Sequence, residues 1–156
     1  MSTTTTTTTI ATATATRVVY VDMVGDLFHA GHVSFLSKVK SLYPDSKIYV
    51  GLMADDQAAS YKRRPILTIT ERSIIVAACR FVDQVFLDAP MPITREFIER
   101  NNIDLVVHGD DISEQASQYW YRDPIEMGIY KEIPYTKGIS TSEIISRLVG
   151  GAALRP

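Results

Sequence analysis

The chain has 156 residues, of which 46% are hydrophobic and 22% charged, and its net charge is −2. This length suits one domain with a buried core, and the near-neutral charge gives no electrostatic basis for binding nucleic acid or a membrane surface. No apolar run is long enough to span a bilayer. Cys79 is the single cysteine and lies in an apolar stretch, so we expect it to be buried. A chain that cannot form an internal disulfide fits a reducing, cytoplasmic compartment.

The predicted elements alternate between strands and helices along the chain. Residues 1–16 are rich in Thr and Ala and are expected to be disordered. β-branched runs predict strands, and helical spacing of apolar residues with capping pairs predicts helices. The expected strands cover 18–21, 47–52, 82–87 and 105–107, and the expected helices cover 29–43, 68–81, 94–101 and the segment after Ser140. A basic loop is expected at 54–67, and a linker or tail at 150–156. This order predicts one α/β domain over 17–149 with a Rossmann-like, doubly wound parallel sheet.

The three histidines all follow predicted strands, where ligands bind in such sheets. His29 and His32 are three residues apart at the start of a helix, so both can face one point. The free N–H groups of a helix start and the small Gly31 favour close approach of an anion such as phosphate. A zinc site is the alternative, but it needs a third ligand. The sequence offers no evident one, so we predict no bound protein metal. His108 follows the fourth predicted strand.

Four motifs make the chain recognisable. Residues 29–32, His-Ala-Gly-His, match the His-x-Gly-His motif of the nucleotidyltransferase superfamily, and Gly-Ile-Ser-Thr-Ser at 138–142 resembles a signature of its cytidylyltransferase branch. Residues 80–85 resemble that branch's Arg-Tyr-Val-Asp-Glu-Val, and 88–90 resemble its Asn-Ala-Pro. Because these motifs occur in order over 17–149, the chain is identified as similar to the cytidylyltransferases.

The resemblance implies an activity and its residues. An acceptor phosphate oxygen would attack the α-phosphorus of CTP, brought with Mg²⁺, and pyrophosphate would leave. No covalent intermediate forms, so the enzyme positions its substrates and neutralises charge. The catalytic residues implied are His29, His32, Lys62 and Arg80, and Arg63 is an alternative to Lys62. A homodimer is also implied, with Arg80 near its two-fold axis. The alternative for Arg80 is a structural ion pair with Asp83 or with a subunit neighbour.

The same resemblance implies a nucleotide site and two departures from the family pattern. The residues implied to bind nucleotide, besides the two histidines, are Val24, Gly25, Gly31, Gly109, Asp110, Tyr135, Thr136, Gly138, Ile139, Ser140 and Thr141. Asp110 would accept from the cytosine amino group and select CTP. Residues 23–26 read Met-Val-Gly-Asp where the family has Gly-Ile-Phe-Asp. Tyr135 stands where the family has an arginine facing the phosphates, and Lys137 and Arg64 are alternatives for the lost charge.

The acceptor is read from residues that differ from the choline-phosphate enzymes. Those enzymes hold choline against aromatic residues, within Asn-Ala-Pro-Trp and Asp-Asp-Ile-Pro-Tyr, where this chain has Met91 and Glu114. The loss disfavours choline phosphate. Resemblance to the cytidylyltransferase domain of bifunctional phosphonate-antibiotic enzymes favours 2-hydroxyethylphosphonate and implies fusion to a second catalytic domain. Ethanolamine phosphate comes next and glycerol 3-phosphate third. Asp26, Lys62, Met91 and Glu114 are the expected acceptor contacts.

Two other functions and one feature stay open. Adenylyl transfer by the same fold is a second enzyme class, and a CTP sensor without turnover is a non-enzymatic one, suggested by Tyr135. Tyr119, Trp120 and Tyr121 form an aromatic cluster that either packs in a core or interface, which we favour, or covers the acceptor.

Overall fold

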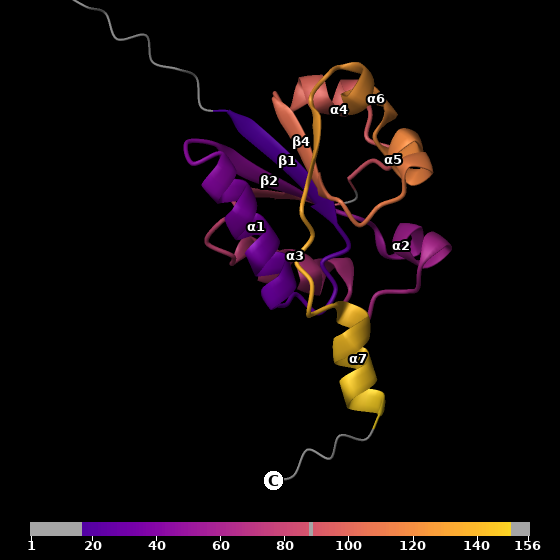
Figure 1. Ribbon diagram of the computed structural model, residues 1–156. Coiled ribbons are helices and arrows are strands. Elements are labelled where there is room, and N and C mark those ends of the chain that lie inside the picture. The colour runs from indigo at the N-terminus through magenta and orange to yellow at the C-terminus, as the bar shows by residue number, and fades with distance from the viewer. Residues whose placement is uncertain (1–16, 88, 151–156) are drawn as a thin grey trace, which may run out of the picture.

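The computed structural model describes residues 17–87 and 89–150, and these form a five-stranded parallel sheet with helices on both faces (Figure 1). The strands are β1 Val18–Met23, β2 Lys47–Leu52, β3 Gln84–Phe86, β4 Leu105–Gly109 and β5 Tyr130–Ile133. The helices are α1 Ala30–Leu42, α2 Asp55–Tyr61, α3 Ile69–Ala77, α4 Arg95–Arg100, α5 Glu114–Trp120, α6 Arg122–Glu126 and α7 Thr141–Val149. The predictions for 1–16, for Asp88 and for 151–156 lie outside the described residues.

The strand order is β3-β2-β1-β4-β5, and every pair is parallel. The chain therefore builds outward from β1 in one direction and then in the other, which confirms the doubly wound, Rossmann-like fold. The order reverses between β1 and β4, so a crevice opens beyond their carboxyl ends.

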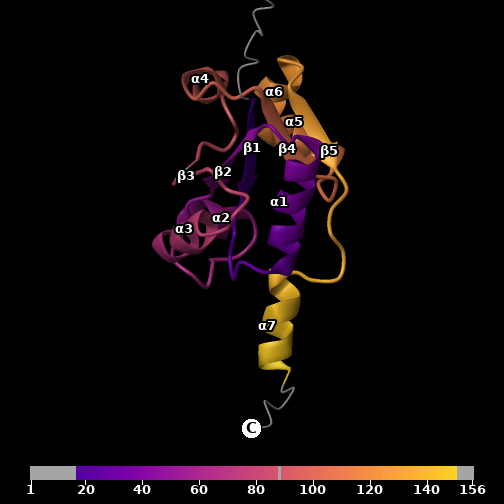
Figure 2. The ribbon, with the colours of Figure 1, turned by 90° about the vertical axis from the view of Figure 1, so that its left-hand side faces the viewer.

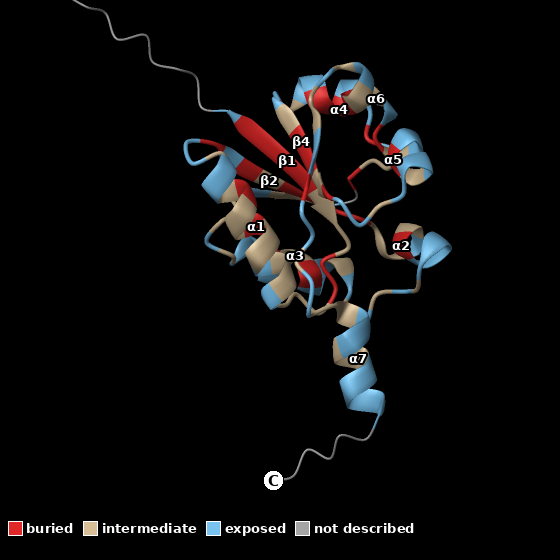
Figure 3. Ribbon diagram, viewed as in Figure 1, coloured by how far each residue is buried: buried red, intermediate tan, exposed pale blue. Residues whose placement is uncertain are grey.

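Two cores cover the two faces of the sheet. In β1, Val19 and Val21 point to the core that α1 and α3 cover, whereas Val18 and Tyr20 point to the core that Phe97 and other residues from the α4–α6 side cover. This division follows from the period of two along a strand. Figure 3 shows the buried residues concentrated on the central strands and on the inner sides of the helices. Cys79 is half-buried and packs against the first core.

The element predictions hold best where the sequence is apolar. The strand at 47–52 is confirmed residue for residue, and the helix after Thr68 has the capping box that Thr68 and Glu71 predicted. That helix ends at Ala77 rather than 81, and the third strand shrinks to 84–86. His108 lies within β4 instead of after it.

Polar elements account for the wrong predictions. Residues 54–67 are not all loop, because they contain α2, which buries only Ala58. The polar stretch after β4 contains α5, α6 and the edge strand β5, none of them predicted. β5 exposes Lys131 and Glu132, so its sequence lacks a clear strand pattern. None of the helices in the described ranges is long and apolar enough to cross a membrane.

Candidate active site

A cavity of about 410 Å³ opens beyond the carboxyl ends of β1 and β4, at the point where the strand order reverses. Its walls come from the β1–α1 loop, the start of α1, the loop after α2, the end of β4, α5 and the start of α7. The sequence-predicted residues that line it are Val24, Gly25, Asp26, His29, Gly31, His32, Lys62, Met91, Gly109, Tyr135, Ser140 and Thr141. The structure thus brings most of the predicted site together.

His29 and His32 form a reciprocal cap on the first turn of α1. The Nδ1 atom of His29 accepts from the N–H of Gly31 at 3.0 Å, and Nδ1 of His32 accepts from the N–H of His29 at 3.1 Å. A neutral imidazole that accepts at Nδ1 carries its proton at Nε2. Both rings therefore keep an Nε2–H donor for another partner.

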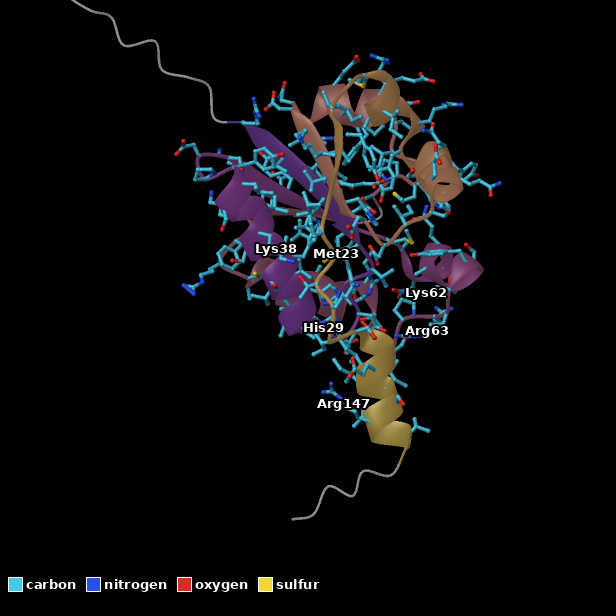
Figure 4. All side chains as sticks on the ribbon, in the orientation of Figure 1. Met23, His29, Lys38, Lys62, Arg63 and Arg147 are labelled. Atoms are coloured by element: carbon cyan, nitrogen blue, oxygen red, sulfur yellow. The ribbon has the colours of Figure 1, made fainter. Side chains whose placement is uncertain are left out.

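Burial keeps these two imidazoles neutral. Burial, with the neighbouring His29 and Lys62, lowers the pKa of His32 to about 4, although Asp26 opposes the fall. Burial also lowers the pKa of His29. The cavity therefore offers an anion two neutral hydrogen-bond donors and the positive end of the α1 dipole. Full charges come from the loop after α2, where Figure 4 shows Lys62 and Arg63 on the other side of the site from His29.

Asp26 holds that basic loop. Its carboxylate accepts from the N–H groups of Ile66 and Leu67, each at 3.0 Å, and pairs with Arg63 at 3.0 Å. Burial alone would raise the pKa of Asp26, but the hydrogen bonds from Leu67 and Ile66 and the pairing with Arg63 outweigh it and hold the pKa below its usual range. In this conformation both carboxylate oxygens bind the loop, which gives Asp26 a positioning role, and its contact with an acceptor stays a prediction.

Arg72 holds together the segments that follow β1 and β2. Its side chain is fully buried, donates to the carbonyls of Val24, Met53 and Leu67, and pairs with Asp55. Arg72 was not among the site residues predicted from the sequence. In the structure, Arg72 joins the loops that follow β1 and β2.

One end of the cavity is acidic and aromatic, and the sequence did not predict it. Asp22 stands at the end of β1, and the Tyr121 hydroxyl donates to both its oxygens at 2.9 Å. Burial raises the pKa of the Asp22 carboxyl, although the nearby His108 and the Tyr121 hydrogen bond oppose the rise. Within residues 17–87 and 89–150 no Lys or Arg forms an ion pair with Asp22.

Aromatic rings line the same cavity as this carboxylate. Tyr61 and Trp120 lie with ring centroids 6.1 Å apart, and both line the cavity with Tyr121 and Met91. The expectation of core packing holds for Tyr121, which is buried in the second core, and for Trp120, which packs against that core, and both residues also line the cavity. Only Tyr119, 62% exposed, lies outside. The absence of aromatics at 91 and 114 thus leaves the cavity with other aromatic faces.

Other predicted residues lie away from the cavity. Arg80 is exposed and its guanidinium stacks 5.5 Å from the ring centroid of Phe81, without an ion pair to Asp83 among the described residues. Asp110 accepts from the N–H of Tyr135 at 2.8 Å, so it orders the chain beside the cavity. The remaining predicted residues outside the lining are Glu114, Thr136, Gly138 and Ile139. Their contacts with substrate stay predictions.

His108 differs from the other two histidines. Its Nδ1 lies 2.8 Å from the carbonyl of Gly109, which only accepts, so Nδ1 carries the proton and Nε2 is the acceptor when the ring is neutral.

A signal for Asp22 was present in the sequence, because a lone carboxylate at the end of the apolar run Val18–Val21 is unusual. Among the described residues, no three His, Cys, Asp or Glu side chains gather as a metal site would require.

The fold and this cavity define a class: an α/β protein with a cavity at the switch point of a doubly wound sheet, where the start of a helix contributes to its lining. The comparisons give the family. The cytidylyltransferase-like family model matches residues 25–147, and the chain belongs to this family.

Named relatives support the assignment. The chain is 39% identical over 133 residues to choline-phosphate cytidylyltransferase A of Rattus norvegicus, covering 84% of this chain and 36% of that protein. It is 41% identical over 141 residues to ethanolamine-phosphate cytidylyltransferase of Arabidopsis thaliana, covering 85% and 32%. The chain thus spans about a third of the length of these relatives.

A solved structure matches the fold. It is the lipopolysaccharide core biosynthesis protein from Thermoplasma volcanium GSS1, with a TM-score of 0.60 and 22% identity. The match covers 79% of this chain and 98% of that one.

Proposed function

We propose that the chain transfers a cytidylyl group from CTP to a small phosphate- or phosphonate-bearing alcohol. The observation that carries this is the reciprocal cap of His29 and His32, which aims two neutral Nε2–H donors at a cavity whose other side holds Lys62. An acceptor oxygen forms a bond to the α-phosphorus, the bond from that phosphorus to the bridging oxygen breaks, and pyrophosphate carries the electron pair away. The relatives described above act, by their names, on choline phosphate and ethanolamine phosphate.

The residues divide the work of that transfer. The histidines donate to phosphate oxygens as charge builds in the transition state, and they do so without a proton that must first be lost or gained. Lys62 neutralises the departing phosphates, and Arg63 is near enough to join it once released from Asp26. The hydroxyls of Ser140 and Thr141 add donors at the start of α7.

Mg²⁺ is part of the proposal as the partner of CTP. Mg²⁺ in nucleotide enzymes is held by phosphate oxygens, waters and one or two carboxylates. Asp111 lines the cavity and supplies such an oxygen, whereas the Asp26 carboxylate is committed to its loop. The residues present fit a cation that arrives on the triphosphate, where it would neutralise phosphate charge.

The acidic end of the cavity points to an acceptor with a cationic tail. Asp22 is half-buried, no lysine or arginine of the described chain forms an ion pair with it, and Tyr61 and Trp120 line the same cavity. An ammonium there would gain a carboxylate and aromatic faces together. The geometry therefore favours ethanolamine phosphate as acceptor, ahead of the sequence-based choice. A second candidate, 2-hydroxyethylphosphonate, fits because Tyr121 and Asp22 form a hydrogen-bonding pair that a hydroxyl can join.

A panel of acceptors assayed with the wild type and Asp22→Asn tests both statements. Pyrophosphate release with CTP and any of these acceptors supports cytidylyl transfer, and turnover that is as fast with ATP contradicts it. For an ammonium acceptor, removing the carboxylate should lower kcat/KM by about tenfold or more, the scale of a buried charge-assisted hydrogen bond. For 2-hydroxyethylphosphonate, whose neutral hydroxyl can also hydrogen-bond to an amide, the same change should lower kcat/KM by about threefold or less. Choline phosphate as best acceptor would show that the rings, rather than hydrogen bonding, decide.

We also propose a homodimer. β3 is an edge strand of the sheet, and Arg80 with Phe81 is displayed just before it, which suits the two-fold contact that the family resemblance implies. A monomer mass by sedimentation at micromolar concentration would contradict this.

A further inference from the structure

The segment 134–140, here called the strap, joins β5 to α7 without helix or strand of its own. Figure 2 shows it running alongside α1 from the end of β5 to the start of α7. It brings Tyr135 and Ser140 to the cavity. The position of these two residues therefore depends on what holds the strap.

One ridge of α1 meets the strap along its length. At Gly31 an added Cβ would lie 3.2 Å from Cγ2 of Ile139, so the absence of a side chain lets the strap come close. One turn further, the hydroxyl of Thr136 donates to that of Ser34 at 3.3 Å. A further turn along, Lys38 reaches the strap's first residues. Spacings of three and four residues place these positions on one face of the helix, so the strap runs antiparallel to α1.

Lys38 makes two of the strap's contacts. Its Nζ atom donates to the carbonyl of Pro134 at 3.2 Å and to Oγ1 of Thr136 at 3.1 Å. These partners stand on either side of Tyr135, whose own N–H is held from the other side by Asp110 at 2.8 Å. Tyr135 is thus clamped between α1 and the end of β4. Lys38 itself lies outside the cavity lining, and Figure 4 shows it on α1 beside the strap.

We infer that Lys38 is a positioning residue for the nucleotide, acting through the strap; this rests on the proposed function. With Pro134 and Thr136 fixed, Tyr135 and the start of α7 face the cavity before CTP arrives, so binding does not have to order them. Loss of Lys38 lets the strap sample open positions, and CTP binding must then close it.

Substitution Lys38→Met keeps a long, unbranched side chain and removes both hydrogen bonds. We expect KM for CTP to rise about five- to tenfold, the effect of one or two net hydrogen bonds, with kcat and the acceptor KM within about twofold of wild type. Lys38→Arg, which keeps charge and donors, should restore most of the affinity. Lys40→Met is the matched control, because Lys40 lies on the same helix and donates to the carbonyl of Ser46, away from the strap.

A second readout does not use activity. Trypsin cuts after lysine, and Lys137 lies exposed in the strap. Cleavage at Lys137, followed by mass spectrometry without nucleotide, should be several-fold faster in Lys38→Met than in wild type and Lys40→Met. Equal cleavage rates, or faster cleavage with an unchanged KM for CTP, would overturn the inference. If the wild type does not turn over CTP at all, the proposed function fails, whereas cleavage still reports on the anchor. If Lys38→Met does not fold, Lys38→Ala, which also removes both hydrogen bonds, takes its place in both measurements.

Discussion

Removing the titration of His32 should flatten the pH dependence of folding stability. The ring lies between Phe28, stacked at 5.1 Å between centroids, and His29, at 4.0 Å. This burial lowers its pKa from 6.5 to about 4. A histidine whose pKa falls on folding is charged more readily in the unfolded chain. Its contribution to stability is therefore unaffected above the unfolded pKa and is lost as pH falls below 6.5, until the folded pKa is reached.

The size of the loss follows from the two pKa values. With 6.5 unfolded and about 4 folded, linkage gives a loss of about 2 kcal/mol between about pH 8 and about pH 5, and on the order of 3 kcal/mol at the acid limit. The neighbouring His29 and Lys62 lower the pKa of His32 further, and Asp26 raises it. The value of about 4 already includes these three effects.

Urea unfolding of wild type and His32→Asn at the two pH values measures this difference. Asparagine can place Oδ1 where Nδ1 accepts from the N–H of His29, and it does not titrate. We expect the wild type to lose about 2 kcal/mol more than the variant between about pH 8 and about pH 5. Equal losses would refute the claim that His32 is held neutral, and so would an NMR titration of the ring with a midpoint above 6.5.

Three further substitutions test the interior and the cavity. Arg72→Lys should cost about 3 kcal/mol or more in urea unfolding, because one ammonium cannot serve the four partners of a buried guanidinium; an unchanged midpoint would contradict this. Tyr20→Phe should be neutral or stabilising by about 1 kcal/mol, because the buried hydroxyl has no hydrogen-bond partner in the described structure; a large loss would reveal an unseen partner. Lys62→Met should lower kcat by about 10²-fold with folding retained, the scale for removing a transition-state donor; near-normal turnover would transfer the role to Arg63.

The fold was predictable because its central elements are apolar and can each be recognised from a short segment of sequence. The runs at 18–21 and 47–52 can be read as buried strands without knowing their neighbours, and the capping pair of Thr68 and Glu71 marks a helix start within four residues. The elements that the sequence hid have no such local signal. α2 and β5 are short and polar, and they form because the adjoining sheet and loops fix their ends.

The site was predictable where one segment supplies it and hidden where distant segments meet. His29 and His32 act within a single turn, so their spacing alone indicated an anion site. Asp22 and Tyr121 are 99 residues apart in sequence, and their contact exists only after β1 and the α5–α6 corner come together. For the same reason the roles of Arg72 and Asp26 in fixing loops were not predicted from the sequence.

The β1–α1 loop explains how the chain departs from the family pattern at 23–26 and keeps its site. The loop makes its contacts through two backbone carbonyls and one side chain. Arg72 donates to the carbonyl of Val24, and Thr141 donates to the carbonyl of Asp26. The Asp26 carboxylate holds the basic loop. Carbonyls are present whatever the side chain, so Met-Val-Gly can replace Gly-Ile-Phe, whereas the aspartate that ends both versions is used directly.

Gly25 shows what the replacement required. Its φ is +68°, and an added Cβ would lie 3.1 Å from Cδ2 of Leu52. A bulky side chain in this position would need both a different backbone angle and a repacked neighbour. In this chain the glycine lets the loop turn tightly over β2, so that the carbonyl of Val24 meets Arg72 and Asp26 points to its loop. The departure is therefore a change in how the turn is made, and it leaves in place the contacts that hold His29 and Lys62 on opposite sides of the cavity.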